Sequence, residues 1–285
     1  MRHPVTWLDV FTSTPLTGNQ LAVVHDADAI DDATMLAFAR ETRFSETAFV
    51  QTATAPGADY RNRIWMMTGE IAFAGHPSLG TAVAVARVRG VQQASYVQQT
   101  HAGNQSVDVR LDGDTARASM LQERPTFGEE PPSEDVMAVA GLSAVDAHPD
   151  LPCQVVSTGA VQLIAPLRGR EALERVTVVD MHALRSLIEP FGAVVLYLVA
   201  VDPDAGCAHA RAFFPSVGEL VEDPATGSAA GPLLAYLHDR AGTQSLSIRQ
   251  GDEIGRPSRL DCTWAEDRPR VAGDVVVVAD GHVSL

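Results

Sequence analysis

Lysine is absent from this sequence of 285 residues, so all 21 of its basic residues are arginines. Without a lysine amine a protein cannot form a Schiff base, which excludes pyridoxal phosphate enzymes and lysine-dependent aldolases. A Walker A loop would also lack its lysine, and no GxGxxG motif follows a strand-like stretch. The sequence therefore predicts neither amine-based covalent catalysis nor a nucleotide site of these two kinds.

Cysteine is scarce, and long apolar runs are missing. Cys153, Cys207 and Cys262 lie far apart without a CxxC motif, and the nine histidines follow no spacing typical of metal ligands. We therefore predict no metal, no cofactor and no redox role for the thiols. The first residues, MRHPVTWLDVF, contain no apolar leader core, and no stretch reaches the length of a membrane span. These features predict a cytoplasmic protein.

Acidic residues outnumber basic ones by 36 to 21, which gives a formal net charge of −15. Such a charge would repel nucleic acid and anionic membrane surfaces, so we expect neither as a partner. An anionic substrate would have to be held by local dipoles or arginines. Arg63 and Arg211 each precede a loop-to-helix turn, where they could hold an anion or form a structural salt bridge; the salt bridge is the favoured interpretation.

Strand-like patterns dominate the chain. They cover residues 5–11, 21–25, 46–52, 60–67, 94–100, 106–111, 115–121, 152–158, 161–166, 193–201, 207–214, 245–250, 258–264 and 275–284. Helical patterns are fewer: a run capped by Asp31 and Asp32, residues 180–189, and two Ala-rich runs at 78–88 and 228–239. We predict an α+β fold in which each of two pseudo-symmetric halves rolls a curved, mostly antiparallel sheet round one hydrophobic helix.

Residues 123–135, ERPTFGEEPPSED, combine three prolines with five acidic residues, which is typical of a surface linker. We therefore divide the chain into residues 1–124, which carry Glu46 and His76, and residues 125–285, which carry Asp223. The last predicted strand could pair back with the first half.

One short phrase occurs twice, as AGHPSLGTA at 74–82 and as EDPATGSAA at 222–230. At a constant offset of 147 residues, His76 aligns with Asp223 and Gly80 with Gly227. Backbone N–H groups at a helix start lack intrahelical partners and attract anions. We predict that the two starts face one another across a cleft that holds a carboxylate. Alternatively, Asp223 and Ser228 only cap their own helix.

Glu46 lies in RFSETAFV, where a helix end turns into an apolar strand. A carboxylate partly desolvated by Phe44, Ala48 and Phe49 would have a raised proton affinity, which suits proton transfer. The alternative is an exposed carboxylate at a strand end.

Four segments in this order resemble the PhzF-like family of phenazine-biosynthesis isomerases. They are DVFTSTPLTGNQLAVV at 9–24, SETAFV at 45–50, GHPSLGTA at 75–82 and EDPATGSAAGPL at 222–233. The resemblance implies the diaminopimelate-epimerase fold, an active site between two similar halves, no cofactor or metal, and a homodimer.

The resemblance also implies roles for individual residues. Glu46 matches the family's catalytic acid/base, and His76 and Asp223 match catalytic residues that flank the substrate from the two helix starts. Residues implied to bind substrate are Gly75, Gly227 and Ser228, and, in matching motifs, Gly18, Asn19, Gln20 and Ser45.

A racemising enzyme needs one base on each face of a carbon, whereas moving a proton along a conjugated system needs a single base. One well-placed glutamate fits the second reaction. We therefore expect a cofactor-independent isomerase that moves a proton within a small, unsaturated, carboxylated metabolite, in secondary-metabolite biosynthesis such as that of phenazine antibiotics. The alternatives are an epimerase or racemase at a carbon next to a carboxylate, and a non-catalytic protein that binds small molecules or other proteins.

Overall fold

The computed structural model describes residues 1–202, 205–216 and 218–285, and the chain forms two compact units. The first unit contains residues 1–121 and 272–285, and the second contains residues 122–271. Strand β17 (Arg268–Ser284) begins in the second unit, continues into the first, and there pairs antiparallel with β1 (Arg2–Val10).

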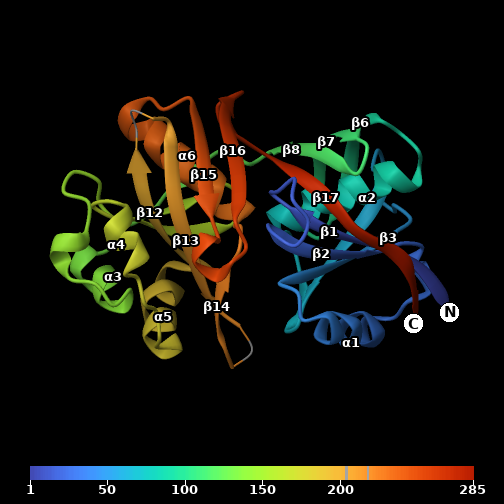
Figure 1. Ribbon diagram of the computed structural model, residues 1–285, viewed down its shortest axis with the longest axis horizontal. Coiled ribbons are helices and arrows are strands. Elements are labelled where there is room, and N and C mark those ends of the chain that lie inside the picture. Colours follow the sequence, from blue (N-terminus) through green and yellow to red (C-terminus); the bar gives the residue numbers. More distant parts are fainter. Residues whose placement is uncertain (203–204, 217) are drawn as a thin grey trace. The chain divides into compact units, whose positions relative to one another are not determined.

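The first unit consists mainly of strands, with one helix inside and one outside. After β1 its elements are β2 (Asn19–Val24), η1 (Ala27–Ala29), α1 (Asp32–Thr42), β3 (Glu46–Gln51), β4 (Tyr60–Met66), β5 (Gly69–Ile71), α2 (Gly75–Val88), β6 (Gln93–Thr100), β7 (Gly103–Asp112) and β8 (Thr115–Leu121). Figure 1 shows α1 outside the strands, at the bottom of this unit.

The second unit has the same kinds of element with additional helices. They are β9 (Thr126–Phe127), α3 (Ser133–Val139), η2 (Ala144–Asp146), β10 (Gln154–Ser157), β11 (Val161–Pro166), α4 (Arg170–Glu174), α5 (Met181–Ile188), η3 (Glu189–Phe191), β12 (Val195–Asp202), β13 (Cys207–Pro215), β14 (Leu220–Asp223), α6 (Gly227–Ala241), β15 (Ser245–Gln250), η4 (Asp252–Ile254) and β16 (Ser258–Ala265). In Figure 1, α3, α4 and α5 lie together beside β12 and β13.

Strand pairing follows one scheme in both units. In the first, β1–β2, β3–β4, β4–β5 and β6–β7 are antiparallel, whereas β2–β3 and β4–β6 are parallel. In the second, β10–β11, β12–β13, β13–β14 and β15–β16 are antiparallel, whereas β11–β12 and β13–β15 are parallel. The predicted duplication and the predicted α+β class are therefore confirmed by topology.

The central helices α2 and α6 are buried, as their Ala-rich sequences predict. In α2 every residue from Gly75 to Ala86 is buried. A Cβ at Gly80 would lie 2.5 Å from Leu21 Cδ2, and one at Gly231 in α6 would lie 1.8 Å from Gln122 Oε1. Glycine at these two positions therefore allows the surrounding side chains to approach the helices closely.

The outer helices cover the sheet faces turned away from α2 and α6 with apolar side chains. In α1, Met35 is fully buried in a cluster with Phe49 and Trp65, and the predicted Leu36 and Phe38 pack against it. In the second unit, α3, α4 and α5 contribute to a larger cluster that includes Leu184 of α5. The sheet in each unit is thus apolar on both faces where helices cover it.

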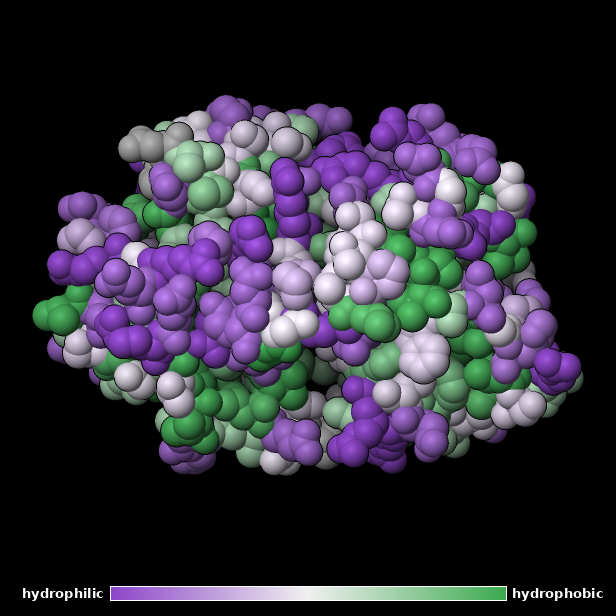
Figure 2. Space-filling view, in the orientation of Figure 1, coloured by the Kyte–Doolittle hydropathy of each residue, from purple (hydrophilic) through white to green (hydrophobic). Residues whose placement is uncertain are grey.

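The molecular surface is mostly hydrophilic on the face shown in Figure 2, with hydrophobic residues in smaller groups between. Large exposed hydrophobic side chains occur in separate elements and include Leu16 at 69% and Val179 at 80% exposure. Single exposed apolar residues of this kind are normal in folded proteins. Within the described residues, no helix is long and apolar enough to cross a membrane.

The structure corrects the sequence analysis at several short elements. Strands β5, β9 and β14 and helices α3 and α4 were not predicted, because each is too short for its periodicity to be recognised. The predicted linker at 123–135 is largely exposed, but it contains β9, which pairs with β10, and the start of α3.

Candidate active site

Glu46 is the first residue of β3, and its position is partly desolvated. Its side chain is only 13% exposed, and Oε2 lies 3.5 Å from Nε2 of His76. In the parallel ladder it pairs with the fully buried Leu21. The interpretation of Glu46 as an exposed carboxylate at a strand end is therefore wrong. The predicted partial desolvation is thus present, and the role of Glu46 in proton transfer stays a prediction.

His76 lies in the first turn of α2 and is 4% exposed. Burial lowers its pKa from 6.5 to about 3, although the carbonyl oxygen of Gln20, 3.3 Å from Nε2, acts in the opposite direction. The imidazole is thus neutral near pH 7. Since the neighbours of Nε2 are a carbonyl oxygen and the Glu46 carboxylate, both acceptors, we infer that Nε2 carries the hydrogen and donates it.

Folding stability should depend on pH because His76 is buried in its neutral form. Below pH 6.5 the His76 imidazole of the unfolded chain binds a proton, whereas in the folded protein it stays unprotonated down to about pH 3. The free energy of unfolding therefore falls as the pH is lowered. His76→Gln should remove about 2 kcal/mol of the stability loss between pH 7 and pH 5. Urea unfolding at the two pH values measures this difference, with His101→Gln as the control. Equal pH dependence in wild type and His76→Gln would contradict it.

Both central helices begin without a side-chain cap. Ala74 is the N-cap residue of α2 and Thr226 that of α6, and neither provides a capping side-chain hydrogen bond. The N–H groups of the first helical residues, Gly75 and Gly227, have no acceptor within their own helices. Each helix start can therefore bind a negatively charged group.

A buried hydrogen-bond network fixes the chain just before α6. The Thr226 hydroxyl donates to Asp223 Oδ2 at 2.6 Å, and the Gln250 amide donates to the Asp223 carbonyl at 2.8 Å. Gln250 Oε1 in turn accepts from Thr226 N at 3.2 Å and from the Tyr197 hydroxyl at 3.1 Å. The sequence analysis did not identify Gln250. Its only signal in the sequence is a glutamine at the end of a strand whose other inward-facing residues, Leu246 and Ile248, are apolar.

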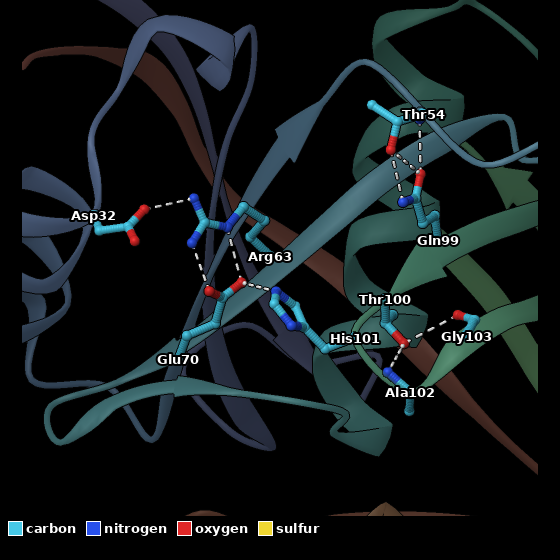
Figure 3. A network of polar contacts seen from close by, with 9 residues as sticks. All are labelled: Asp32, Thr54, Arg63, Glu70, Gln99, Thr100, His101, Ala102 and Gly103. Atoms are coloured by element: carbon cyan, nitrogen blue, oxygen red, sulfur yellow. Dashed lines mark hydrogen bonds and ion pairs between the residues drawn. The ribbon is translucent and has the colours of Figure 1, made fainter.

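Arg63 in β4 binds two carboxylates, as Figure 3 shows. Its guanidinium donates two hydrogen bonds to the Glu70 carboxylate, from Nε to Oε1 at 2.8 Å and from Nη2 to Oε2. Nη1 donates to Asp32 Oδ1 at 2.8 Å. It also lies 5.3 Å from the ring centre of Trp65. His101 Nε2 approaches Glu70 Oε1 at 3.1 Å. Arg63 is therefore engaged in the salt bridge that the sequence analysis favoured.

Arg211 in β13 repeats this arrangement. It is 9% exposed and binds Glu222 at 2.8 Å and 2.7 Å through two nitrogens. Its third nitrogen donates to the carbonyls of Val176 and Leu173, at 2.8 Å and 3.3 Å, and the guanidinium lies 5.1 Å from the ring centre of Phe213. The salt-bridge interpretation is confirmed here as well.

These arginine–glutamate pairs show how the two units correspond. Glu70 pairs with Trp65, and Glu222 pairs with Phe213; each aromatic residue lies two positions after its arginine. The two glutamates are 152 residues apart (222 − 70). The helix starts at Gly75 and Gly227 are also 152 residues apart (227 − 75). The predicted offset of 147 residues is therefore wrong as a structural alignment. His76 and Ser228, the second residues of α2 and α6, occupy equivalent positions.

The duplication is asymmetric at the candidate base. Phe49 faces the arginine of β4, and Leu198 faces that of β13. Three residues earlier on the same strands lie Glu46 and Val195, respectively. The chain thus has a carboxylate at this register in the first unit and an apolar side chain in the second.

The other predicted residues lie at the ends of strands or at the start of α6 in their own units. Asn19 is fully buried at the start of β2, Gln20 offers its carbonyl to His76, and Ser45 is partly buried before β3. Ser228 is partly buried in the first turn of α6. The prediction that both helix starts serve one substrate stays a prediction.

The cysteine thiols are free, and burial raises the pKa of Cys153 and of Cys262. Buried thiols with raised pKa values are poor nucleophiles. In the part of the chain that the structure describes, no three His, Cys, Asp or Glu side chains are grouped so that they could hold a metal ion.

Known proteins are similar in sequence to this chain over nearly its whole length. A family model described as "phenazine biosynthesis-like protein" matches residues 8–281. The chain belongs to this family. The trans-2,3-dihydro-3-hydroxyanthranilate isomerase of Pseudomonas aeruginosa is 34% identical over 265 residues, 90% of this chain and 89% of that protein. The isomerase YddE of Escherichia coli, itself uncharacterized, is 31% identical over 275 residues, 92% of this chain and 90% of that protein.

Solved structures of other proteins have the same fold. A structure from Pseudomonas aeruginosa described as a predicted epimerase has a TM-score of 0.87 and 36% identity, and covers 99% of both chains. A structure from Agrobacterium radiobacter described as a "probable proline racemase" shares the fold at a TM-score of 0.61 with 13% identity, over 99% of this chain and 93% of that one. The predicted family, its fold and its isomerase class are confirmed.

Proposed function

We propose that this protein is a cofactor-independent isomerase in which Glu46 takes a proton from a small, unsaturated, carboxylated metabolite and returns it to another atom. The observation that carries the proposal is the asymmetric duplication. A carboxylate that is 13% exposed touches the neutral His76 in one unit, whereas Val195 stands at the same register in the other. One base suffices for a proton shift, and the second unit has no carboxylate at the register of Glu46.

The surrounding groups suit this reaction. Proton loss next to a carboxylate or carbonyl places additional negative charge on an oxygen, which N–H donors at an uncapped helix start stabilise more strongly than the same oxygen in the ground state. His76 Nε2 lies 3.3 Å from the Gln20 carbonyl and 3.5 Å from the Glu46 carboxylate, and the neutral imidazole adds no permanent positive charge beside the base. We assign Asp223 to the catalytic group beside the substrate, and Gly227 and Ser228 to substrate binding, at the start of α6.

We also propose the setting in which the protein works. Three free thiols fit the reducing cytoplasm. The family resemblance supports a homodimer, and the net charge of −15 favours a small-molecule substrate over nucleic acid or a membrane surface.

Solvent-deuterium incorporation tests the proposed reaction. We expect chelator-treated protein in D₂O to convert trans-2,3-dihydro-3-hydroxyanthranilate, the substrate named for a relative, into a double-bond isomer. The isomer carries a solvent deuteron to the extent that the proton on Glu46 exchanges with solvent before it is returned. An epimerase would exchange the hydrogen while inverting a centre, and a binding protein would exchange nothing. Either of these results, or activity that needs a metal restored, would overturn the proposal.

A further inference from the structure

Gln162 is a polar side chain in an apolar place. It lies in β11, is 0% exposed, and pairs with Val156 of β10 and Val195 of β12. Glutamine is rarely buried fully within a run of apolar strand residues. An amide at this position therefore needs a reason other than sheet packing.

The amide of Gln162 reaches the start of α6. Its Nε2 donates to the hydroxyl oxygen of Ser228 at 3.5 Å, whereas Oε1 has no hydrogen-bond partner among the residues that the structure describes. A buried acceptor without a donor costs about 1–3 kcal/mol of stability. The chain tolerates this cost beside a helix start that can bind an anion.

The first unit contains the same arrangement with a different polar residue. The pair Leu21 and Glu46 in β2 and β3 occupies the register of Gln162 and Val195 in β11 and β12. In each pair one side chain is polar, and it lies 3.5 Å from the second residue of the central helix, Glu46 from His76 and Gln162 from Ser228. Gln162 itself takes the register of Leu21, so in the second unit the polar side chain beside the helix start comes from the neighbouring strand.

Ser228 links Gln162 to an anion at the helix start. Because its oxygen accepts the Gln162 amide hydrogen, the hydroxyl hydrogen remains available to a ligand carboxylate together with the N–H of Gly227. The nearby Thr226 hydroxyl is engaged with Asp223. The start of α6 thus offers donors from the helix and one acceptor, the Gln162 carbonyl.

We propose that Gln162 determines specificity by accepting a hydrogen bond from an amino or hydroxyl group next to the carboxylate that the start of α6 binds. The inference rests on the proposed function and narrows its substrate class to carboxylates that carry such a donor on the adjacent carbon. A carboxylate without the donor would leave the Gln162 carbonyl unsatisfied and bind more weakly.

Binding of two aromatic acids tests this inference. We expect 2-aminobenzoate to bind about tenfold more tightly than benzoate, which lacks the donor, and both to shift the NMR amide signals of Gly227 and Ser228. In Gln162→Leu the two affinities should become equal because 2-aminobenzoate loses its advantage. Ser228→Ala should weaken both ligands to a similar extent.

Gln154→Leu is the matched control. Gln154, the first residue of β10, is also buried, and its amide donates to the Gly128 carbonyl at 3.3 Å. It should keep the tenfold preference. If Gln162→Leu unfolds, Gln162→Met replaces it. A preference that survives the loss of Gln162, equal affinity in wild type, or no shift at Gly227 and Ser228 would overturn the inference.

The outcome can be separated from that of the proposed reaction because binding requires no turnover. A Gln162-dependent preference without deuterium incorporation would support this specificity role and refute the proton shift. Deuterium incorporation without the preference would support the reaction and refute the role of Gln162.

Discussion

Replacement of Glu46 by glutamine should lower turnover by about 10²–10⁴-fold while leaving substrate binding nearly unchanged. Glutamine keeps the shape of the side chain but cannot take a proton, and His76 Nε2 can still approach its amide oxygen. Steady-state kinetics and deuterium incorporation, with ligand affinity measured separately, check this result.

Glu41→Gln is the control for a change of charge alone, because Glu41 is exposed in the same unit. It should retain wild-type turnover. Activity of Glu46→Gln within tenfold of wild type would refute the assignment of Glu46 as the base. An equal loss of binding and turnover would instead indicate that the carboxylate mainly holds the substrate.

Replacement of Arg211 by methionine should destabilise the protein by about 3–5 kcal/mol. The change leaves the Glu222 carboxylate, which is 14% exposed, without its bidentate partner. It also removes the donor to the carbonyls of Leu173 and Val176. Urea or guanidinium unfolding at pH 7 measures the loss.

Two further variants make this test specific. Arg211→Met combined with Glu222→Met should recover much of the stability, because removing both charges leaves no buried unpaired ion. Arg170→Met removes an exposed partner of Glu174, where both side chains are about half exposed, and should cost less than about 1 kcal/mol. Equal losses from Arg211→Met and Arg170→Met would contradict a structural role for the buried pair.

Sequence reasoning found the central helices and most longer strands because their signals are local. The Ala-rich runs that form α2 and α6 are apolar on every side, and helices with that pattern are buried. The strands of three or four residues, β5 and β14, carry no such signal. They form because antiparallel partners are already in place on β4 and β13.

The repeated phrase revealed the duplication but gave the wrong alignment. Six residues separate Arg63 from Glu70, whereas ten separate Arg211 from Glu222. A longer hairpin changes the sequence offset without changing which residues face one another across the ladder. Strand register, which depends on tertiary pairing, therefore decides that His76 corresponds to Ser228.

The sequence by itself determined the family, the α+β class and the identity of Glu46 as the candidate base, because these depend on motifs and on local hydrophobic periodicity. Only the tertiary structure decided that His76 is neutral, that both arginines are occupied by glutamates, and that Gln162 lies against Ser228. Burial and pairing between distant segments set these properties, since a side chain's pKa and its partners depend on what packs around it.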